Sequence, residues 1–185
     1  LQEALEVLKK LVGEGKVVLL VGTKIQIRSL VKETAEVCGV PYVSERWIGG
    51  LFTNFDTISK RLAHLKELEE KKASGEFEKY TKKEQHDIAK EIERLEVKFG
   101  GIKSLQKLPD AVFIVDLDEN GLASREARRK NIPTIAISDT NTDPTSVDYA
   151  IPANDDAVSS VKYILGKVQE TILVAKSKPV SERQA

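Results

Sequence analysis

Cysteine, methionine and tryptophan are nearly absent from this 185-residue sequence, which has one cysteine, no methionine and one tryptophan. The cysteine, Cys38, lies in an apolar helical pattern with no second cysteine to pair with and no metal-ligand spacing around it. We therefore expect a buried thiol in a reducing cytoplasm. No apolar run approaches the roughly 18 to 20 residues that span a bilayer, so no membrane association is expected.

An excess of charge of either sign is also missing, because 29 Lys and Arg balance 29 Asp and Glu. This balance excludes nucleic-acid binding by bulk attraction, so any RNA contact must come from local patches. The distribution is uneven, because no Lys or Arg lies between Lys130 and Lys162. Five aspartates fall in that interval and predict an acidic face: Asp139, Asp143, Asp148, Asp155 and Asp156.

Five short apolar runs of strand length alternate with helical patterns. The first, Lys16–Gly22, has no polar alternation, which is typical of a central strand covered on both faces. The others are Val40–Val43, Ala111–Asp116, Pro133–Ser138 and Asp148–Ile151. This alternation predicts a doubly wound α/β fold with five parallel strands in the order 2-1-3-4-5.

The connection between the second and third strands is too long for a simple crossover. Capping-box patterns at Thr53–Asp56 and Thr81–Glu84 predict the starts of two helices. Their apolar residues have coiled-coil spacing: Ile58, Leu62, Leu65 and Leu68, then Ile88, Ile92, Leu95 and Phe99. We expect an antiparallel coiled-coil hairpin over 54–100, inserted into a sheet domain of 1–53 and 101–176, with a flexible tail at 177–185.

The ends of the later helices are marked by turn-forming residues. Asn131 favours a left-handed turn after a helix over Glu119–Lys130, and Pro133 prevents its continuation. Asn154 is expected to cap a last helix that ends near Val174.

The segment Val21–Lys24 lies where a doubly wound fold binds phosphate, at the end of a strand and the start of a helix. Neither common glycine-rich phosphate motif is present. Two interpretations of this segment therefore remain open: a tight turn with a surface lysine, or the ligand site of a nucleotide-binding or phosphate-binding enzyme. We assign no catalytic residue and no cofactor. Spacing requires no metal, although Asp139, Asp155 and Asp156 would gather a divalent cation if their loops converge.

The stretch Arg46–Asn54 holds the only tryptophan, beside an arginine and a glycine pair. Two interpretations remain open from these residues: Trp47 fills a gap between the sheet and the insertion, or the loop contacts nucleic acid.

Seven motifs, in order along nearly the whole chain, resemble the ribosomal protein S2 family of bacteria and organelles. They are Val21–Lys24, Arg46–Asn54, Thr81–Glu84, Gly100–Lys103, Leu108–Ala111, Asp139–Pro144 and Ile151–Ala157. The family's N-terminal segment, rich in Gly, His, Arg and aromatic residues, is missing ahead of Leu1, which implies an N-terminal truncation.

The resemblance implies a flavodoxin-like domain with a coiled-coil arm in the small ribosomal subunit, without catalysis. Its implied partners are small-subunit ribosomal RNA, neighbouring ribosomal proteins and ribosomal protein S1. Because carboxylates repel phosphates, we expect the five aspartates to serve protein docking, by family analogy that of S1. The alternative is a solvated face whose aspartates cap the last helix and shape the preceding loops. Six residues become candidate RNA contacts: Lys24, Arg28, Arg46, Trp47, Lys60 and Arg61.

Overall fold

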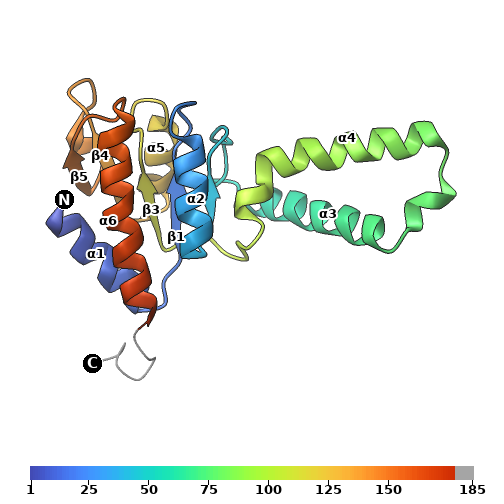
Figure 1. Ribbon diagram of the computed structural model, residues 1–185, viewed down its shortest axis with the longest axis horizontal. Helices are drawn as coiled ribbons and strands as arrows, with labels where there is room; N and C mark the ends of the chain where they lie inside the picture. The colour runs from blue at the N-terminus through green and yellow to red at the C-terminus, as the bar shows by residue number, and fades with distance from the viewer. Residues whose placement is uncertain (178–185) are drawn as a thin grey trace.

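Five parallel strands form the centre of the computed structural model, which describes residues 1–177 (Figure 1). The strands are β1 (Val18–Val21), β2 (Tyr42–Val43), β3 (Ala111–Ile114), β4 (Thr134–Ser138) and β5 (Tyr149–Pro152). They lie in the order β2-β1-β3-β4-β5, and every pair is parallel. The predicted order is therefore confirmed, and the all-parallel sheet within an α/β structure fits a flavodoxin-like fold.

Helices cover both faces of the sheet, which explains why the strands carry continuous apolar runs. On one face lie α1 (Gln2–Gly13), α2 (Arg28–Cys38) and α6 (Val158–Ser177), and on the other lies α5 (Gly121–Arg129) (Figure 1). Cys38 is buried on the first face, as expected. The end of β1 approaches α2 closely, because a Cβ on Gly22 would lie 2.7 Å from Cγ2 of Val31.

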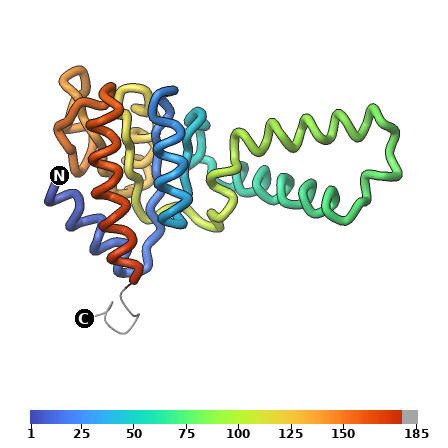
Figure 2. Tube along the Cα trace, viewed as in Figure 1, coloured from blue at the N-terminus to red at the C-terminus, as the bar shows by residue number. Residues whose placement is uncertain are grey.

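Two long helices lie between β2 and β3 in the chain. They are α3 (Phe55–Ala73) and α4 (Lys82–Phe99), joined by the short 3-10 helix η1 (Glu76–Lys79), and η2 (Gly100–Ile102) leads back to the sheet. Figure 2 shows one helix extending away from the sheet and the other returning to it, with the two closer together at the sheet than at their far ends. We call this pair the arm. Its buried side chains continue the apolar cluster on the α5 face: Ile58, Leu62, Leu65, Ile92, Leu95 and Phe99.

The two predicted capping boxes have different outcomes. The box at the start of α4 is confirmed, because the Thr81 hydroxyl accepts from the Glu84 N–H and the Glu84 carboxylate accepts from the Thr81 N–H. The prediction for α3 is wrong, because that helix begins at Phe55 without a side-chain cap. The Thr53 hydroxyl and N–H instead both donate to the Glu126 carboxylate, and the helix starts one residue later than the pattern indicated, with Asn54 at the N-cap position.

Of the two predicted helix-end signals, the left-handed turn after α5 is confirmed and the Asn154 cap is not. Asn131 follows α5 with φ of 53°, the left-handed conformation expected there. The Asn154 side chain accepts from the N–H groups of Asp156 and Ala157, but α6 begins only at Val158, so Asn154 forms a turn ahead of the helix instead of its N-cap. A further 3-10 helix, η3 (Pro144–Ser146), lies between β4 and β5. The tail expected from residue 177 falls, apart from Ser177 at the end of α6, outside the described residues.

Candidate functional site

The turn after β1 is closed by a carboxylate from the neighbouring strand. Asp116, which is fully buried after β3, accepts hydrogen bonds from the N–H groups of Thr23 at 2.9 Å and Lys24 at 2.8 Å, and from the side chain of Asn120. Burial raises the pKa of Asp116 to about 6, although the N–H donors of Lys24 and Thr23 favour its ionised form. A protein carboxylate thus holds amide donors that a bound phosphate would need, which argues against the nucleotide-binding alternative.

The ammonium group of Lys24 lies between two carboxylates that follow β5. Its Nζ is 2.7 Å from Oδ1 of Asp155, which is buried, and 2.8 Å from Oδ1 of Asp156, which is exposed. Burial of Lys24 would lower its pKa, but the hydrogen bonds to Asp155 and Asp156 outweigh that effect and raise the pKa above its usual value. The predicted surface lysine is therefore an ion-paired residue that ties the β1 turn to the β5 loop.

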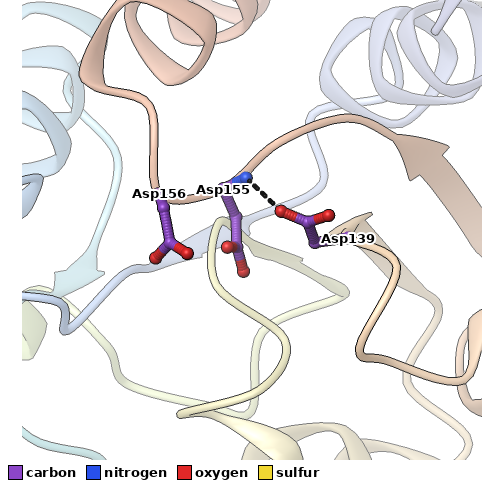
Figure 3. Close-up of side chains that lie close together, drawn as sticks. All are labelled: Asp139, Asp155 and Asp156. Carbon is purple, nitrogen blue, oxygen red and sulfur yellow. Dashed lines mark hydrogen bonds between the residues drawn. The ribbon is translucent and has the colours of Figure 1, made fainter.

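Three of the five predicted aspartates come together at the carboxyl ends of β4 and β5 (Figure 3). Asp139 accepts from the Asp155 N–H at 3.3 Å, and oxygens of Asp139, Asp155 and Asp156 lie within 4.8 Å of one another. We call these three residues the carboxyl-edge cluster. With the Lys24 ammonium it carries two net negative charges, from three carboxylates and one cation.

The cluster has the oxygen ligands that a divalent cation prefers, as expected if the loops converge. Lys24 already neutralises part of its charge, and Oδ2 of buried Asp155 lacks a hydrogen-bond partner among the described residues. A cation would therefore have to compete with the lysine for Asp155 and Asp156.

The other two predicted aspartates lie elsewhere. Asp143 accepts from the Thr145 N–H at 2.9 Å at the start of η3. Asp148 precedes β5 and accepts from the Thr134 N–H at 2.8 Å, which places it at the amino ends of β4 and β5. Because the two ends of a strand face opposite edges of the sheet, the five aspartates do not form a single face.

The loop after β2 is held by a glutamate that the sequence patterns did not single out. The buried Glu126 of α5 accepts from the N–H groups of Gly50 at 2.7 Å, Phe52 at 3.0 Å and Thr53 at 3.2 Å, and from the Trp47 indole at 3.3 Å. Burial would raise the pKa of Glu126, but these donors outweigh burial and lower it. The sequence carried one signal for this residue: Glu126 lies beside Ala127 on the apolar side of α5, where a glutamate is buried only with hydrogen-bond partners.

Trp47 has a structural role in this loop. Its side chain is 7% exposed and meets the Phe52 ring edge-on, with centroids 4.9 Å apart. The ring therefore offers little surface for stacking on a base. The geometry favours the packing interpretation of Trp47.

The candidate basic residues lie around the junction of this loop and the arm. Arg46 and Arg61 are exposed and line one groove of about 630 Å³, together with Arg94 and Lys98 of α4. Arg28 is half-buried and pairs with Glu45 at 2.8 Å. Lys60 is exposed on α3 outside the lining of this groove.

The parallel sheet fits a flavodoxin-like fold, and a carboxylate of the protein itself occupies the turn where such a fold binds phosphate. The family model described as Ribosomal protein S2 matches residues 1–175, and the chain belongs to this family. Members are structural, non-enzymatic components of the small ribosomal subunit that associate with ribosomal RNA and other ribosomal proteins. The family resemblance of the seven motifs is confirmed. Across residues 1–177, every helix is too short or too polar to cross a membrane.

Proposed function

We propose that this chain binds ribosomal RNA at the junction of the Arg46 loop and the arm, and presents the carboxyl-edge cluster to a protein partner. The observation that carries the proposal is the separation of charge in a chain with no net charge. Exposed guanidinium groups gather at the base of the arm, whereas two net negative charges lie at the ends of β4 and β5. Phosphates favour the first surface and are repelled by the second.

The RNA-binding proposal gives the predicted residues different tasks. Arg46, Lys60 and Arg61 are exposed cations that reach phosphates directly, and Arg28 lies beside them in its pair with Glu45. Trp47, which is buried, positions the loop instead. Lys24 is engaged by Asp155 and Asp156, so it organises the acidic edge rather than contacting phosphates.

The proposal also includes a coiled-coil arm that is separable from the sheet. The apolar residues of α3 and α4 recur at coiled-coil spacing, and those nearest the sheet are buried: Ile58, Leu62, Leu65, Ile92 and Leu95. These observations support a division into a sheet domain of 1–53 and 101–176 and an inserted hairpin of 54–100.

The protein partner that we propose for the acidic edge is ribosomal protein S1. Asp139 and Asp156 are accessible, whereas Asp155 is fully buried and holds Lys24 in place. A partner with basic residues would complement the two net negative charges of the cluster. Asp143 and Asp148, which lie outside the cluster, are peripheral to this contact.

The RNA contact is tested by reversing the charges of Arg46 and Arg61 together to Glu. We expect weaker incorporation into small subunits depleted of this protein, and a smaller dependence of incorporation on salt, because two phosphate contacts are lost. A matched control reverses Lys9 and Lys162, exposed residues of α1 and α6 on the other face of the sheet. Incorporation equal to that of the control would contradict the RNA-binding surface.

The protein contact is tested by replacing Asp139 and Asp156 together by Asn, which removes charge with little change in volume. We expect subunits that carry this variant to retain less S1 than unmodified subunits across a salt titration. The pair Asp143→Asn and Asp148→Asn is the matched control, because it removes the same charge outside the cluster. Equal S1 occupancy for the two variants would remove the cluster from the docking site.

A further inference from the structure

The outer part of the arm has no buried core of its own. Leu65 is the last buried residue of α3 and Ile92 is the first buried residue of α4, so every residue of 66–91 is exposed or half-buried. We call this range the outer arm. A segment with few buried apolar contacts is held weakly by packing. The direction of the outer arm therefore depends on polar contacts as well.

The ion pairs between the arm and the rest of the chain converge on Lys103, which follows η2. Its Nζ is 2.6 Å from Oε1 of Glu69, near the far end of α3, and it also pairs with Glu96, near the sheet end of α4. Among the ion pairs of residues 1–177, these two alone join an arm helix to a residue outside the arm. We call Lys103, Glu69 and Glu96 the arm brace.

The backbone from which the brace extends is anchored to the sheet domain. Ile102 and Leu105, on either side of Lys103, are buried in the apolar cluster on the α5 face. Gly101 lies so close to β2 that a Cβ at this position would overlap the carbonyl oxygen of Tyr42. The ammonium group of Lys103 thus holds both arm helices from a point that is fixed on the sheet.

The charge of Lys103 is needed for this arrangement. Burial would lower the pKa of Lys103, but the hydrogen bonds to Glu69 and Glu96 outweigh that effect and raise the pKa above its usual value. The two carboxylates lie close to each other, because both bind the same ammonium nitrogen. Without the cation they would repel each other and push α3 away from α4.

We propose that Lys103 is a positioning residue that sets the direction of the outer arm relative to the sheet, by bracing Glu69 and Glu96 against the anchored backbone after η2. The inference goes beyond the proposed function, because it concerns the free protein and not what the arm contacts. A helix rises about 1.5 Å per residue, so Lys82 lies roughly 20 Å from Glu96 along α4. A rotation of about 10° at the brace therefore moves the tip of the arm by roughly 4 Å.

The test measures the distance between the arm and the sheet with two spin labels on the full chain. One label is attached through Ala73→Cys at the far end of α3 and the other through Lys162→Cys on α6, and both positions are exposed. The natural Cys38 is 2% exposed and is not expected to react. Electron–electron double resonance then gives the distribution of distances between the two labels.

We expect a narrow distribution for the protein with the natural brace and a distribution roughly twice as wide for Lys103→Gln. The matched control is Lys107→Gln, which removes the same charge four residues further along the chain, where Lys107 pairs with Asp110 at 3.3 Å. The control should leave the width unchanged. Lys103→Arg, which keeps the cation, should also retain the narrow distribution.

A charge exchange separates bracing from simple packing of the lysine side chain. Lys103→Glu alone places three carboxylates together and should give the widest distribution. Adding Glu69→Lys to this change restores one cation between two carboxylates with the positions exchanged, and should narrow the distribution again. A lysine that only fills space would show no such recovery.

Stability and arm direction are expected to respond differently. A partly exposed ion pair contributes little to the free energy of unfolding, so Lys103→Gln and Lys107→Gln should have similar urea midpoints. Equal label distributions for these two variants would overturn the brace. If Lys103→Gln does not fold, the charge-exchanged variant decides: a narrow distribution supports the brace, whereas a wide one, or failure to fold, overturns it.

Discussion

Glu126 shows how one side chain can determine the path of a loop that is distant in the sequence. Its carboxylate takes hydrogen bonds from Trp47, Gly50 and Phe52, residues that precede it by 79, 76 and 74 positions. Hydrogen bonds to a charged acceptor are the strong class, and these lie mostly away from water. The direction in which the loop presents Arg46 therefore depends on α5.

Replacing Glu126 by Gln should destabilise the protein by about 2–3 kcal/mol. An NH₂ group, which is a donor, would replace one of the two carboxylate oxygens, so the N–H groups bonded to that oxygen would lose their acceptor. The free energy of unfolding is measured by urea denaturation. The matched control is Glu119→Gln, which makes the same change at an exposed residue just before α5. A loss no greater than that of the control would show that the loop does not depend on the charge.

The Glu126 variant should also change the acid limb of the stability curve. The pKa of Glu126 is lowered from 4.5 in the folded state, so its contribution is present above the unfolded pKa and is lost as the pH falls through the folded value. We expect the Glu126→Gln variant to lose less stability than the unmodified protein as the pH falls below about 4.5. Urea midpoints measured across this range check the difference.

Asp116 should act on stability in the opposite direction. Its pKa rises from 3.8 to about 6 on folding, so the folded state binds the proton more tightly. Stability contributed by the protonated form is therefore present at low pH and is lost as the pH rises from about 4 to about 6. The Asp116→Asn variant lacks this titration. Over that pH interval it should therefore lose less stability than the unmodified protein, and the difference should be on the order of 2–3 kcal/mol. Parallel curves for the two proteins would contradict this linkage.

Individual partners were the least predictable part of the site. The sequence singled out Lys24, Arg46, Trp47 and the clustered aspartates, and all of these lie at or beside the described surfaces. The partner of Lys24 is Asp155, 131 positions away, and no local spacing reveals such a contact. From the sequence alone, Lys24 was therefore interpreted as a surface lysine, and only the fold shows its ion pair with Asp155.

Among the elements, α4 has a start that is fully determined by local chemistry. Thr81 and Glu84 satisfy each other's backbone N–H groups, in a region of the arm exposed to water. The patterns that predicted the strands were also local, because a continuous apolar run is recognised from the residues of the strand itself. The start of α3 was predicted to within one residue, but its capping box was not formed, because the Thr53 hydroxyl donates to Glu126, a partner 73 positions away that no local pattern reveals.

Replacing Thr81 by Ala should weaken the first turn of α4 by about 1 kcal/mol, since an amide donor loses its side-chain acceptor. The local effect is measured by hydrogen exchange of the Glu84 and Gln85 amides, which bond to the Thr81 hydroxyl and carbonyl and should exchange roughly fivefold faster. Thr57→Ala, an exposed change inside α3, serves as the comparison. Exchange that is unchanged at the start of α4 would show that the turn forms without the cap.

At the scale of the whole molecule, the arm should be removable. Deleting 66–91 and bridging the gap with a short Gly-Ser linker keeps the buried base of the arm, including Leu65, Ile92 and Leu95. We expect one cooperative thermal transition for the remaining sheet domain, because its two apolar clusters stay covered. A broad transition without cooperativity would mean that the outer arm is part of the folding unit.

The hairpin form of the arm also has a consequence for how quickly the sheet assembles. The adjacent strands β1 and β3 are joined across about 93 residues, the separation of Val17 and Asp110, whose side chain accepts from the Val17 N–H. About half of that intervening chain lies in α3, η1 and α4, whose two ends return to the same place. If the hairpin closes first, the effective loop is halved, and the entropic cost of pairing β1 with β3 falls by roughly 0.6 kcal/mol. The arm thus shortens the effective loop between β1 and β3, and slower closure of the hairpin would delay the pairing of these two strands.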